Sequence, residues 1–275
     1  MSVLTQRQRL AVGDRAVSAE RRVSDVIAAS GATFPGSGAS LTGVVVAGVL
    51  DASNLDGAAR TGLQWNTVSA VEADDVVRAE SVITRVQRSE DTVEVDRDLR
   101  LIDENGNVRE QGIETWRLPE GSAVGTDPAT DFCTVAWAEL LREPLADDRN
   151  FTSSLATWDG TIGLCCLDGS GHNREVHLRI YRGRIIDISR RVPGGATFTL
   201  RAPASTWVDL VFGEHHDFMR RAIRGEFSSA GDGYEYLRLT KPLDILVTHA
   251  RAAANDRRRA QNDTSPLTGG REARS

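Results

Sequence analysis

The sequence predicts an α+β protein of two domains. A stretch rich in Pro, Gly, Ser and Asp at residues 119–128 divides the 275 residues into two regions of ordinary domain size. Before it, a small-residue helix precedes strands of alternating polarity, and after it short strands are mixed with amphipathic helices. We therefore expect domains at residues 1–121 and 132–254. A linker at residues 122–131 joins them, and a polar, disordered tail follows at residues 255–275.

Composition and charge argue against several classes of protein. The formal net charge of −6 disfavours a nucleic-acid binder, which needs a basic face. No apolar run approaches the roughly 20 residues that span a bilayer, and the N-terminus has no apolar signal-peptide core. We expect a cytoplasmic protein without a membrane span. The three cysteines lack metal-binding spacing, so we expect small buried side chains, no metal and no other cofactor.

The first region is expected to contain one helix followed by an antiparallel meander. Residues 45–59 are small and apolar, which favours a packed helix. The expected strands alternate in polarity and cover residues 76–86, 92–101 and 108–118. Asn105 and Gly106 predict a tight hairpin turn in which both central residues have positive φ.

The second region is expected to mix strands with helices. The expected strands are residues 176–180, 185–188, 196–200 and 234–239. The expected helices are residues 132–141, 203–212, 217–223 and 242–253. In the second of these helices, Trp207, Leu210 and Val211 share one face.

Several short motifs follow one another along residues 8–118. Val12-Gly13-Asp14 precedes a first strand, V-I-A-A-S-G at residues 26–31 precedes a loop, and G-V-V-V-A-G-V-L at residues 43–50 opens the small-residue helix. In this order, and with the last two strands, they resemble the MaoC-like (R)-specific enoyl-CoA hydratases of the hot-dog family. The resemblance implies a hot-dog domain, an antiparallel sheet around a central helix, which pairs into a homodimer or heteromer.

The sequence departs from this family at its catalytic pair. Such hydratases use an Asp and a His five residues apart, and these positions fall on Ala32 and Ser37 here. Neither side chain acts as a base near neutral pH. Ala47 also replaces the His that precedes the helix glycine in the family. Standard hydration chemistry is therefore not expected.

A thioester-binding helix terminus is still implied by the resemblance. Free N–H groups and the positive end of the helix dipole can hold a thioester oxygen or a phosphate, and we assign this role to Gly43, Ala47 and Gly48. Asp51 and Asp56 are candidates for a relocated catalytic acid or base. The alternative for both aspartates is an ordinary solvated position on the helix.

The second region carries another set of ordered motifs. They are Trp158-Asp159-Gly160-Thr161, the strand 176–181 with Gly183, A-T-F-T-L at residues 196–200, Phe218-Met219 and Leu237-Arg238-Leu239. They resemble the sterol-carrier-protein-2 (SCP2)-like family, which implies an apolar tunnel between sheet and helices and no shared catalytic residue. The candidate ligand-binding residues are Trp207, Phe212, Phe218, Met219, Phe227 and Leu246. For each of them, an ordinary core position is the open alternative.

One polar cluster, Gly213-Glu214-His215-His216-Asp217, precedes an expected helix. Adjacent histidines in regular structure do not face one metal, and no third His lies at helical spacing. An acidic residue that caps the helix explains the cluster better than a metal site.

Three functions are consistent with the sequence. The first is a binding or carrier protein for an apolar acyl, lipid, steroid or polyketide-type ligand, free or linked to CoA. The second is a diverged hot-dog enzyme, a dehydratase, isomerase, thioesterase or cyclase acting on such an intermediate with relocated residues. The third is a non-catalytic partner subunit of a hydratase or thiolase complex. A carboxylate or His directed into the hot-dog pocket would favour the enzyme.

Overall fold

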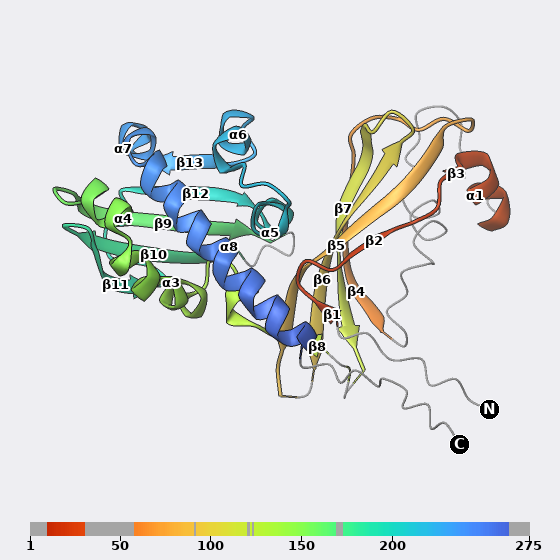
Figure 1. The fold of residues 1–275 in the computed structure, drawn as a ribbon. Helices are drawn as coiled ribbons and strands as arrows, with labels where there is room; N and C mark the ends of the chain where they lie inside the picture. Colours follow the sequence, from red (N-terminus) through yellow and green to blue (C-terminus); the bar gives the residue numbers. More distant parts are fainter. Residues whose placement is uncertain are drawn as a thin grey trace, which may run out of the picture. The chain divides into compact units, whose positions relative to one another are not determined.

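The computed structural model, shown in Figure 1, describes residues 10–30, 58–90, 92–119, 122, 124–168 and 173–263. The chain divides into two compact units. The first is built mainly on residues up to Thr126, and the second on most of the residues from Asp127 onward. The described part confirms the expected α+β class, because each unit combines a sheet with helices.

The first unit contains a six-stranded antiparallel sheet. Its strand order is β2-β5-β6-β7-β4, and β3 also pairs with β5. The strands are β2 (Arg15–Val17), β3 (Arg21–Arg22), β4 (Ala59–Thr67), β5 (Val76–Arg88), β6 (Val93–Asp103) and β7 (Val108–Leu118). A separate parallel pair joins β1 (Leu10–Ala11) to β8 (Val124–Gly125). The expected meander is confirmed as β5, β6 and β7, whereas β4 was not predicted.

One face of this sheet forms an apolar core with helix α1 (Val23–Ser30). The helix contributes Val23, Val26 and Ile27, which are at most 4% exposed. Strands β5 and β6 contribute Val77, Ala79, Leu99 and Leu101, and Trp65 of β4 packs against the cluster. We call this side of the sheet the core face. The alternation of residues along β5 and β6 produces it directly.

The same core face carries a buried ion pair. Arg97 of β6 lies opposite Glu114 of β7, and its guanidinium donates to the Glu114 carboxylate at 2.7 Å. The Trp116 indole N–H donates to the same carboxylate at 2.9 Å, and Arg60 of β4 adds a bond at 3.1 Å. Both guanidinium groups also lie over the Trp116 ring, at 5.7 Å and 6.0 Å from its centroid. The Glu114 carboxylate thus accepts hydrogen bonds from three donors.

A second carboxylate, Glu110, lies on the same face of β7, two residues before Gly112 and four before Glu114. It is fully buried and accepts a hydrogen bond from the Trp65 indole N–H at 2.7 Å. A Cβ on residue 112 would lie 2.1 Å from the Trp65 ring and 2.4 Å from the Gln64 carbonyl oxygen. Only glycine therefore lets the indole cross β7 between the two carboxylates.

The turn between β6 and β7 differs from the expected one. Only Gly106 has positive φ, at 83°, so the turn is not the expected type with two such residues. Asp103 stabilises the turn instead. Its carboxylate accepts hydrogen bonds from the backbone N–H groups of Asn105 and Asn107 at 2.9 Å and 2.8 Å. Burial alone would raise the pKa of Asp103, but these bonds and one from Arg109 hold it below its ordinary value.

The second unit contains a five-stranded sheet in the order β11-β10-β9-β12-β13. Its strands are β9 (Asp159–Leu167), β10 (Arg174–Tyr181), β11 (Arg184–Ser189), β12 (Phe198–Pro203) and β13 (Ser228–Gly231). The helices are α3 (Val135–Asp147), α4 (Arg149–Ser154), α5 (Ala204–Phe212), α6 (Phe218–Ile223), α7 (Gly233–Arg238) and α8 (Thr240–Asp263). Figure 1 shows the long α8 running across one face of the sheet. Helices α3, α4, α6 and α7 all contact it.

Two helices of this unit differ from the prediction. Residues 234–239 were expected to be a strand, but Gly233–Arg238 form α7. Asp232 starts this helix by accepting from the N–H groups of Tyr234 and Glu235, and the alternating sequence does not reveal that cap. Helix α8 continues to Asp263, beyond the expected end at Ala253. Its Ala- and Arg-rich continuation has high helix propensity, and the residues expected to be a tail begin inside it.

The Arg97–Glu114 pair yields a stability prediction. Glu114→Leu leaves the Arg97 guanidinium buried without Glu114 as its counter-ion and should cost about 3–5 kcal/mol. Arg97→Met should cost less, because Arg60 still bonds the Glu114 carboxylate. The double variant should lose clearly less unfolding free energy than the two single variants lose together. Urea-induced unfolding of the four proteins measures the coupling.

The exposed pair Arg117–Glu94, at 3.4 Å with side chains 53% and 39% exposed, is the matched control for this cycle. Its coupling should stay below about 1 kcal/mol. Equal coupling energies in the two cycles would contradict the burial argument.

Asp148 yields a second prediction. Its carboxylate caps α4 through the N–H groups of Asn150 and Phe151 at 2.8 Å and 3.0 Å, and it pairs with His249 of α8 at 3.0 Å. The bond from Phe151, followed by that from His249, lowers the pKa of Asp148. Asp148→Ala should cost about 1 kcal/mol at neutral pH.

The pH dependence of that loss follows from the direction of the shift. A lowered folded-state pKa means that the stabilisation is present above the unfolded pKa near 3.9 and is lost as the pH falls through the folded value. The difference in stability between the native protein and Asp148→Asn should therefore shrink below about pH 4. Thermal unfolding from neutral to acidic pH measures it, and a difference that grows on acidification would contradict this assignment.

Candidate functional site

The thioester-site residues proposed from the sequence, Gly43, Ala47 and Gly48, lie outside the described residues. Asp51 and Asp56, the candidates for a relocated acid or base, lie outside them as well. The geometry of the first unit therefore concerns its sheet and α1 alone. On that sheet, Glu110 and Glu114 are the buried carboxylates of the core face, and the sequence analysis did not select them.

The candidate ligand-binding residues of the second region are located on α5, α6, α8 and the segment before β13. Trp207 of α5 is grouped with the first compact unit, and the others with the second. Trp207, Phe218 and Leu246 are at most 1% exposed, and Phe227 is 5% exposed. Phe212 is half-buried and lies under the Arg258 guanidinium at 5.1 Å. Met219 differs from the rest, because it is 42% exposed. The set thus contains buried apolar residues and one residue at the surface.

Helix α6 and the segment before β13 are joined by an aromatic pair and an ionic clamp. The Phe218 and Phe227 rings meet edge to face, with centroids 5.4 Å apart. Arg221 pairs with Asp217 at 2.7 Å and with Glu226 at 2.8 Å. Burial acts to raise the pKa of Asp217, but Arg221 lowers it below the ordinary value. The clamp fixes Phe218 towards the interior.

Helix α7 is fixed in the same manner by its inner side chains. Tyr236 packs edge to face on Phe198 of β12, at 5.8 Å between centroids. Glu235 accepts from the Trp158 indole N–H at 2.7 Å and pairs with Arg238 at 2.7 Å. Burial raises the pKa of the Tyr236 hydroxyl. These contacts leave the opposite side of α7 facing solvent.

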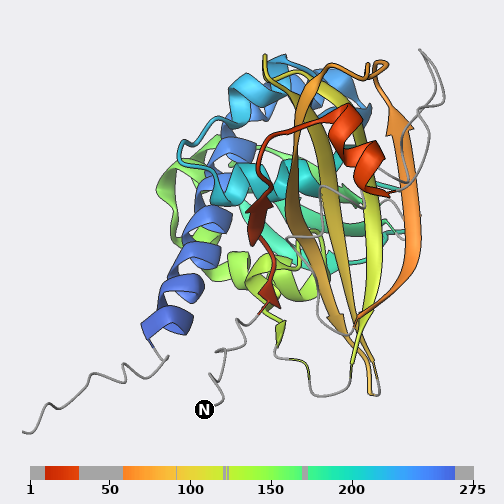
Figure 2. The ribbon, with the colours of Figure 1, turned by 90° about the vertical axis from the view of Figure 1, so that its right-hand side faces the viewer.

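The solvent sides of α6 and α7 are unusually apolar. Among the described residues, the most exposed large apolar side chains are Ile223 at 83%, Tyr234 at 73% and Leu237 at 67%. Figures 1 and 2 show α6 and α7 along the upper edge of the second unit, and in Figure 1 they lie at the two opposite ends of β13. A large exposed apolar patch marks a place of contact with a ligand, a partner or a membrane. Met219 and Ile223, four residues apart, were the available sequence signal for it.

The histidine cluster before α6 is not a capping site. Asp217 makes no side-chain cap bond and pairs with Arg221 instead, so the capping explanation was wrong. His216 bonds α8, through the Asp244 carbonyl oxygen at 3.2 Å and the Thr248 hydroxyl at 3.1 Å. His215 is exposed. Within the described ranges, no group of three or more His, Cys, Asp or Glu side chains is placed to hold a metal.

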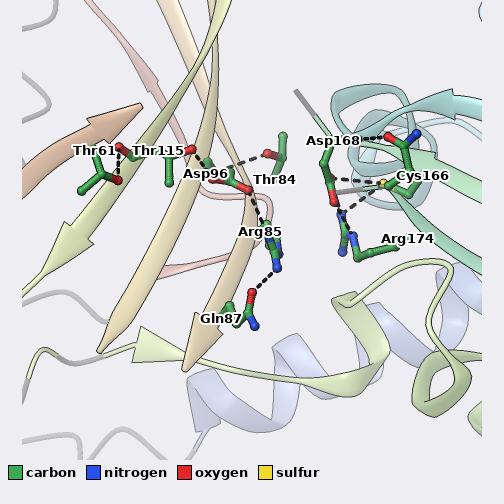
Figure 3. Close-up of polar contacts among 10 residues, drawn as sticks. Thr61, Thr84, Arg85, Gln87, Asp96, Thr115, Cys166, Asp168 and Arg174 are labelled. Atoms are coloured by element: carbon green, nitrogen blue, oxygen red, sulfur yellow. Dashed lines mark hydrogen bonds and ion pairs between the residues drawn. The ribbon is translucent and has the colours of Figure 1, made fainter. Parts of the chain in front are cut away.

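Two further polar clusters are drawn in Figure 3. On the first sheet, the Asp96 carboxylate accepts from Thr115 at 2.8 Å and from Arg85 at 3.4 Å. In the second sheet, Arg174 donates two bonds of 3.1 Å to Asp168 and one of 3.1 Å to the Cys166 sulfur. All three cysteines are buried thiols, as expected for small core side chains.

None of the described helices is both long enough and apolar enough to cross a bilayer.

No protein-family model and no curated protein match this chain. Solved structures do resemble it, in two groups. A crystal structure of sterol carrier protein 2 is 20% identical, with a TM-score of 0.39, and covers 44% of this chain and 98% of its own. Sterol carrier protein 2 from Yarrowia lipolytica in its apo form is 16% identical, with a TM-score of 0.32, and covers 44% of this chain and 94% of its own.

The other group contains dehydratases and hydratases. The MaoC-like dehydratase from Rhodospirillum rubrum is 22% identical, with a TM-score of 0.32, and covers 40% of this chain and 92% of its own. An (R)-hydratase from A. caviae, described as involved in PHA biosynthesis, is 20% identical, with a TM-score of 0.33, and covers 41% of this chain and 99% of its own. The similar structures are thus of two kinds, MaoC-like dehydratases or hydratases and sterol carrier protein 2, and these are the two kinds of protein that the sequence resembles.

Proposed function

We propose that this chain is a binding or carrier protein for an apolar molecule of the acyl, lipid, steroid or polyketide class, held in its second unit. One observation carries the proposal. The buried Phe218–Phe227 pair lies directly behind Met219 and Ile223, which are 42% and 83% exposed on the same helix. Apolar side chains therefore lead from solvent to the interior at α6. The sequence resemblance to the SCP2-like family points to the same ligand class.

The interior behind α6 is apolar on both sides. Helix α8 buries Leu243, Leu246 and Val247, and β12 buries Phe198 and Leu200. An acyl chain or sterol placed among such residues gains roughly 25 cal/mol for each Å² of apolar surface removed from water. Such binding depends on area rather than on directed bonds, so it suits a range of related ligands.

The first test is direct binding. Native mass spectrometry of the full chain should show one-to-one complexes with long-chain fatty acids or sterols. Leu246→Phe would fill space that the ligand is proposed to occupy, and it should weaken binding about ten-fold, which corresponds to about 1.4 kcal/mol.

The matched control is Leu101→Phe, an equal enlargement in the apolar core of the first unit. It should leave the affinity unchanged. If Leu101→Phe alone weakens binding, the ligand is held by the first unit and the proposal is wrong.

A diverged hot-dog enzyme is the second candidate, and one observation favours it. Glu110 and Glu114 are buried carboxylates on the core face, where a relocated acid or base would be needed. Glu114 is the poorer acid–base candidate, because Arg97, Arg60 and Trp116 already bond its carboxylate oxygens. Glu110, bonded to the Trp65 indole, is the better one.

This candidate predicts that the protein changes an acyl-CoA thioester chemically and that Glu110→Gln abolishes this turnover without abolishing thioester binding. Glu72→Gln, at an exposed carboxylate of the same unit, is the control and should remain active. Mass spectrometry of the recovered thioester detects the change. Full activity of Glu110→Gln would exclude Glu110 as the catalytic group.

A further inference from the structure

Tyr236 differs in its surroundings from the other two tyrosines of the chain. Tyr181 and Tyr234 are 41% and 73% exposed, whereas Tyr236 is half-buried on α7. Its ring packs edge to face on Phe198, with the two centroids 5.8 Å apart. Phe198 is fully buried and shares one face of β12 with Leu200. The ring of Tyr236 thus borders the apolar interior in which we place the ligand.

The hydroxyl of Tyr236 has no hydrogen-bond partner among the described residues. A tyrosine hydroxyl that is withdrawn from water usually finds such a partner. Burial raises the pKa of this hydroxyl, and no bond from a neighbouring group offsets that effect. The hydroxyl is therefore able to donate to an oxygen that a bound molecule brings.

The carboxylates of the same segment are already engaged with other donors. Glu235 accepts from the Trp158 indole at 2.7 Å and from the Arg238 guanidinium at 2.7 Å. Asp232 accepts from two backbone N–H groups at the start of α7. The bond between Glu235 and Trp158 also fixes α7, so the Tyr236 side chain is held in place beside Phe198.

A molecule with one polar end needs two kinds of contact when it leaves water. Its apolar part gains from burial, whereas its oxygen loses free energy unless it keeps a hydrogen bond. Tyr236 supplies both contacts, because its ring packs on the buried Phe198 and its hydroxyl is a donor without a partner in the described chain. These two properties point to the polar end of the ligand.

We propose that the Tyr236 hydroxyl donates a hydrogen bond to the oxygen at the polar end of the ligand, whose apolar part lies against Phe198 and Leu200. Tyr236 is then a residue that determines specificity. It favours long-chain acids, alcohols and sterols, which carry an oxygen at one end, over hydrocarbons of the same shape. The inference rests on the proposed function, because it describes how the ligand of the second unit is recognised.

The test compares a probe that carries an oxygen with one that lacks it. The probes are a pyrene-labelled fatty acid and the pyrene-labelled alkane of the same chain length, and fluorescence titration of the full chain measures their affinities. Tyr236→Phe keeps the ring on Phe198 and removes only the hydroxyl. It should weaken binding of the labelled acid about ten-fold, the size of one lost hydrogen bond, and leave binding of the labelled alkane unchanged.

The matched control is Tyr234→Phe, which removes the same group from an exposed position of the same helix. This variant should bind both probes like the native protein. An unchanged affinity of Tyr236→Phe for the labelled acid would overturn the inference. Equal weakening of both probes by Tyr236→Phe would also overturn it, because the hydroxyl would then act on the fold and not on the polar end of the ligand.

The labelled alkane separates this inference from the proposed function. If the native chain binds both probes and Tyr236→Phe binds the acid equally well, the proposed function stands and the role of the hydroxyl is contradicted. If the native chain binds neither probe, the proposed function is contradicted, and the inference that rests on it is contradicted as well.

Discussion

The position of α7 in the second unit depends on the hydrogen bond between the Trp158 indole and Glu235. This bond ties α7 to the residue that precedes β9, and Tyr236 on Phe198 reinforces it. Since α7 is only six residues long, inner contacts of this kind determine which of its side chains reach solvent. Arg221 has the same effect on α6 through Asp217 and Glu226. Inner contacts, both polar and aromatic, thus leave several apolar side chains of these two helices exposed to solvent.

The two units bury different chemistry on their sheets. In the first, the core face combines aliphatic residues with Arg97, Glu110 and Glu114, and buried charges of this kind require complete hydrogen bonding. In the second, the interior behind α6 and α8 is aliphatic and aromatic. An apolar ligand is therefore better accommodated in the second unit. A directed, polar reaction would be better accommodated on the core face of the first.

Much of the fold could be predicted from the sequence because it follows local periodicity. The alternation along residues 92–101 and the spacing of Trp207, Leu210 and Val211 correspond to β6 and α5. Strand β4 was missed, because its sequence A-R-T-G-L-Q-W-N-T lacks alternation and its place is set by pairing with β7. Helix α7 was taken for a strand because Y-E-Y-L-R-L alternates, whereas the Asp232 cap decides the outcome.

The candidate site was less predictable, because it depends on contacts between distant residues. The sequence identifies Phe218 and Phe227 as apolar, but only the fold brings their rings together. Glu110 and Glu114 share a face by register with β6, and their burial depends on Trp65, Trp116 and Arg97. The sequence of β7 alone does not reveal that its two glutamates face the core, where an apolar residue is usually found. Exposure of Ile223 and Leu237 is likewise a result of tertiary packing.

The central claim is that an apolar ligand occupies the interior of the second unit behind α6 and α8. Hydrogen–deuterium exchange of the full chain, with and without a saturating long-chain fatty acid, tests it most directly. The account predicts slower exchange in Phe218–Ile223 and in the first half of Thr240–Asp263, with no change in Val76–Arg88, Val93–Asp103 and Val108–Leu118. Protection confined to those three strands, with none in α6 and α8, would contradict it.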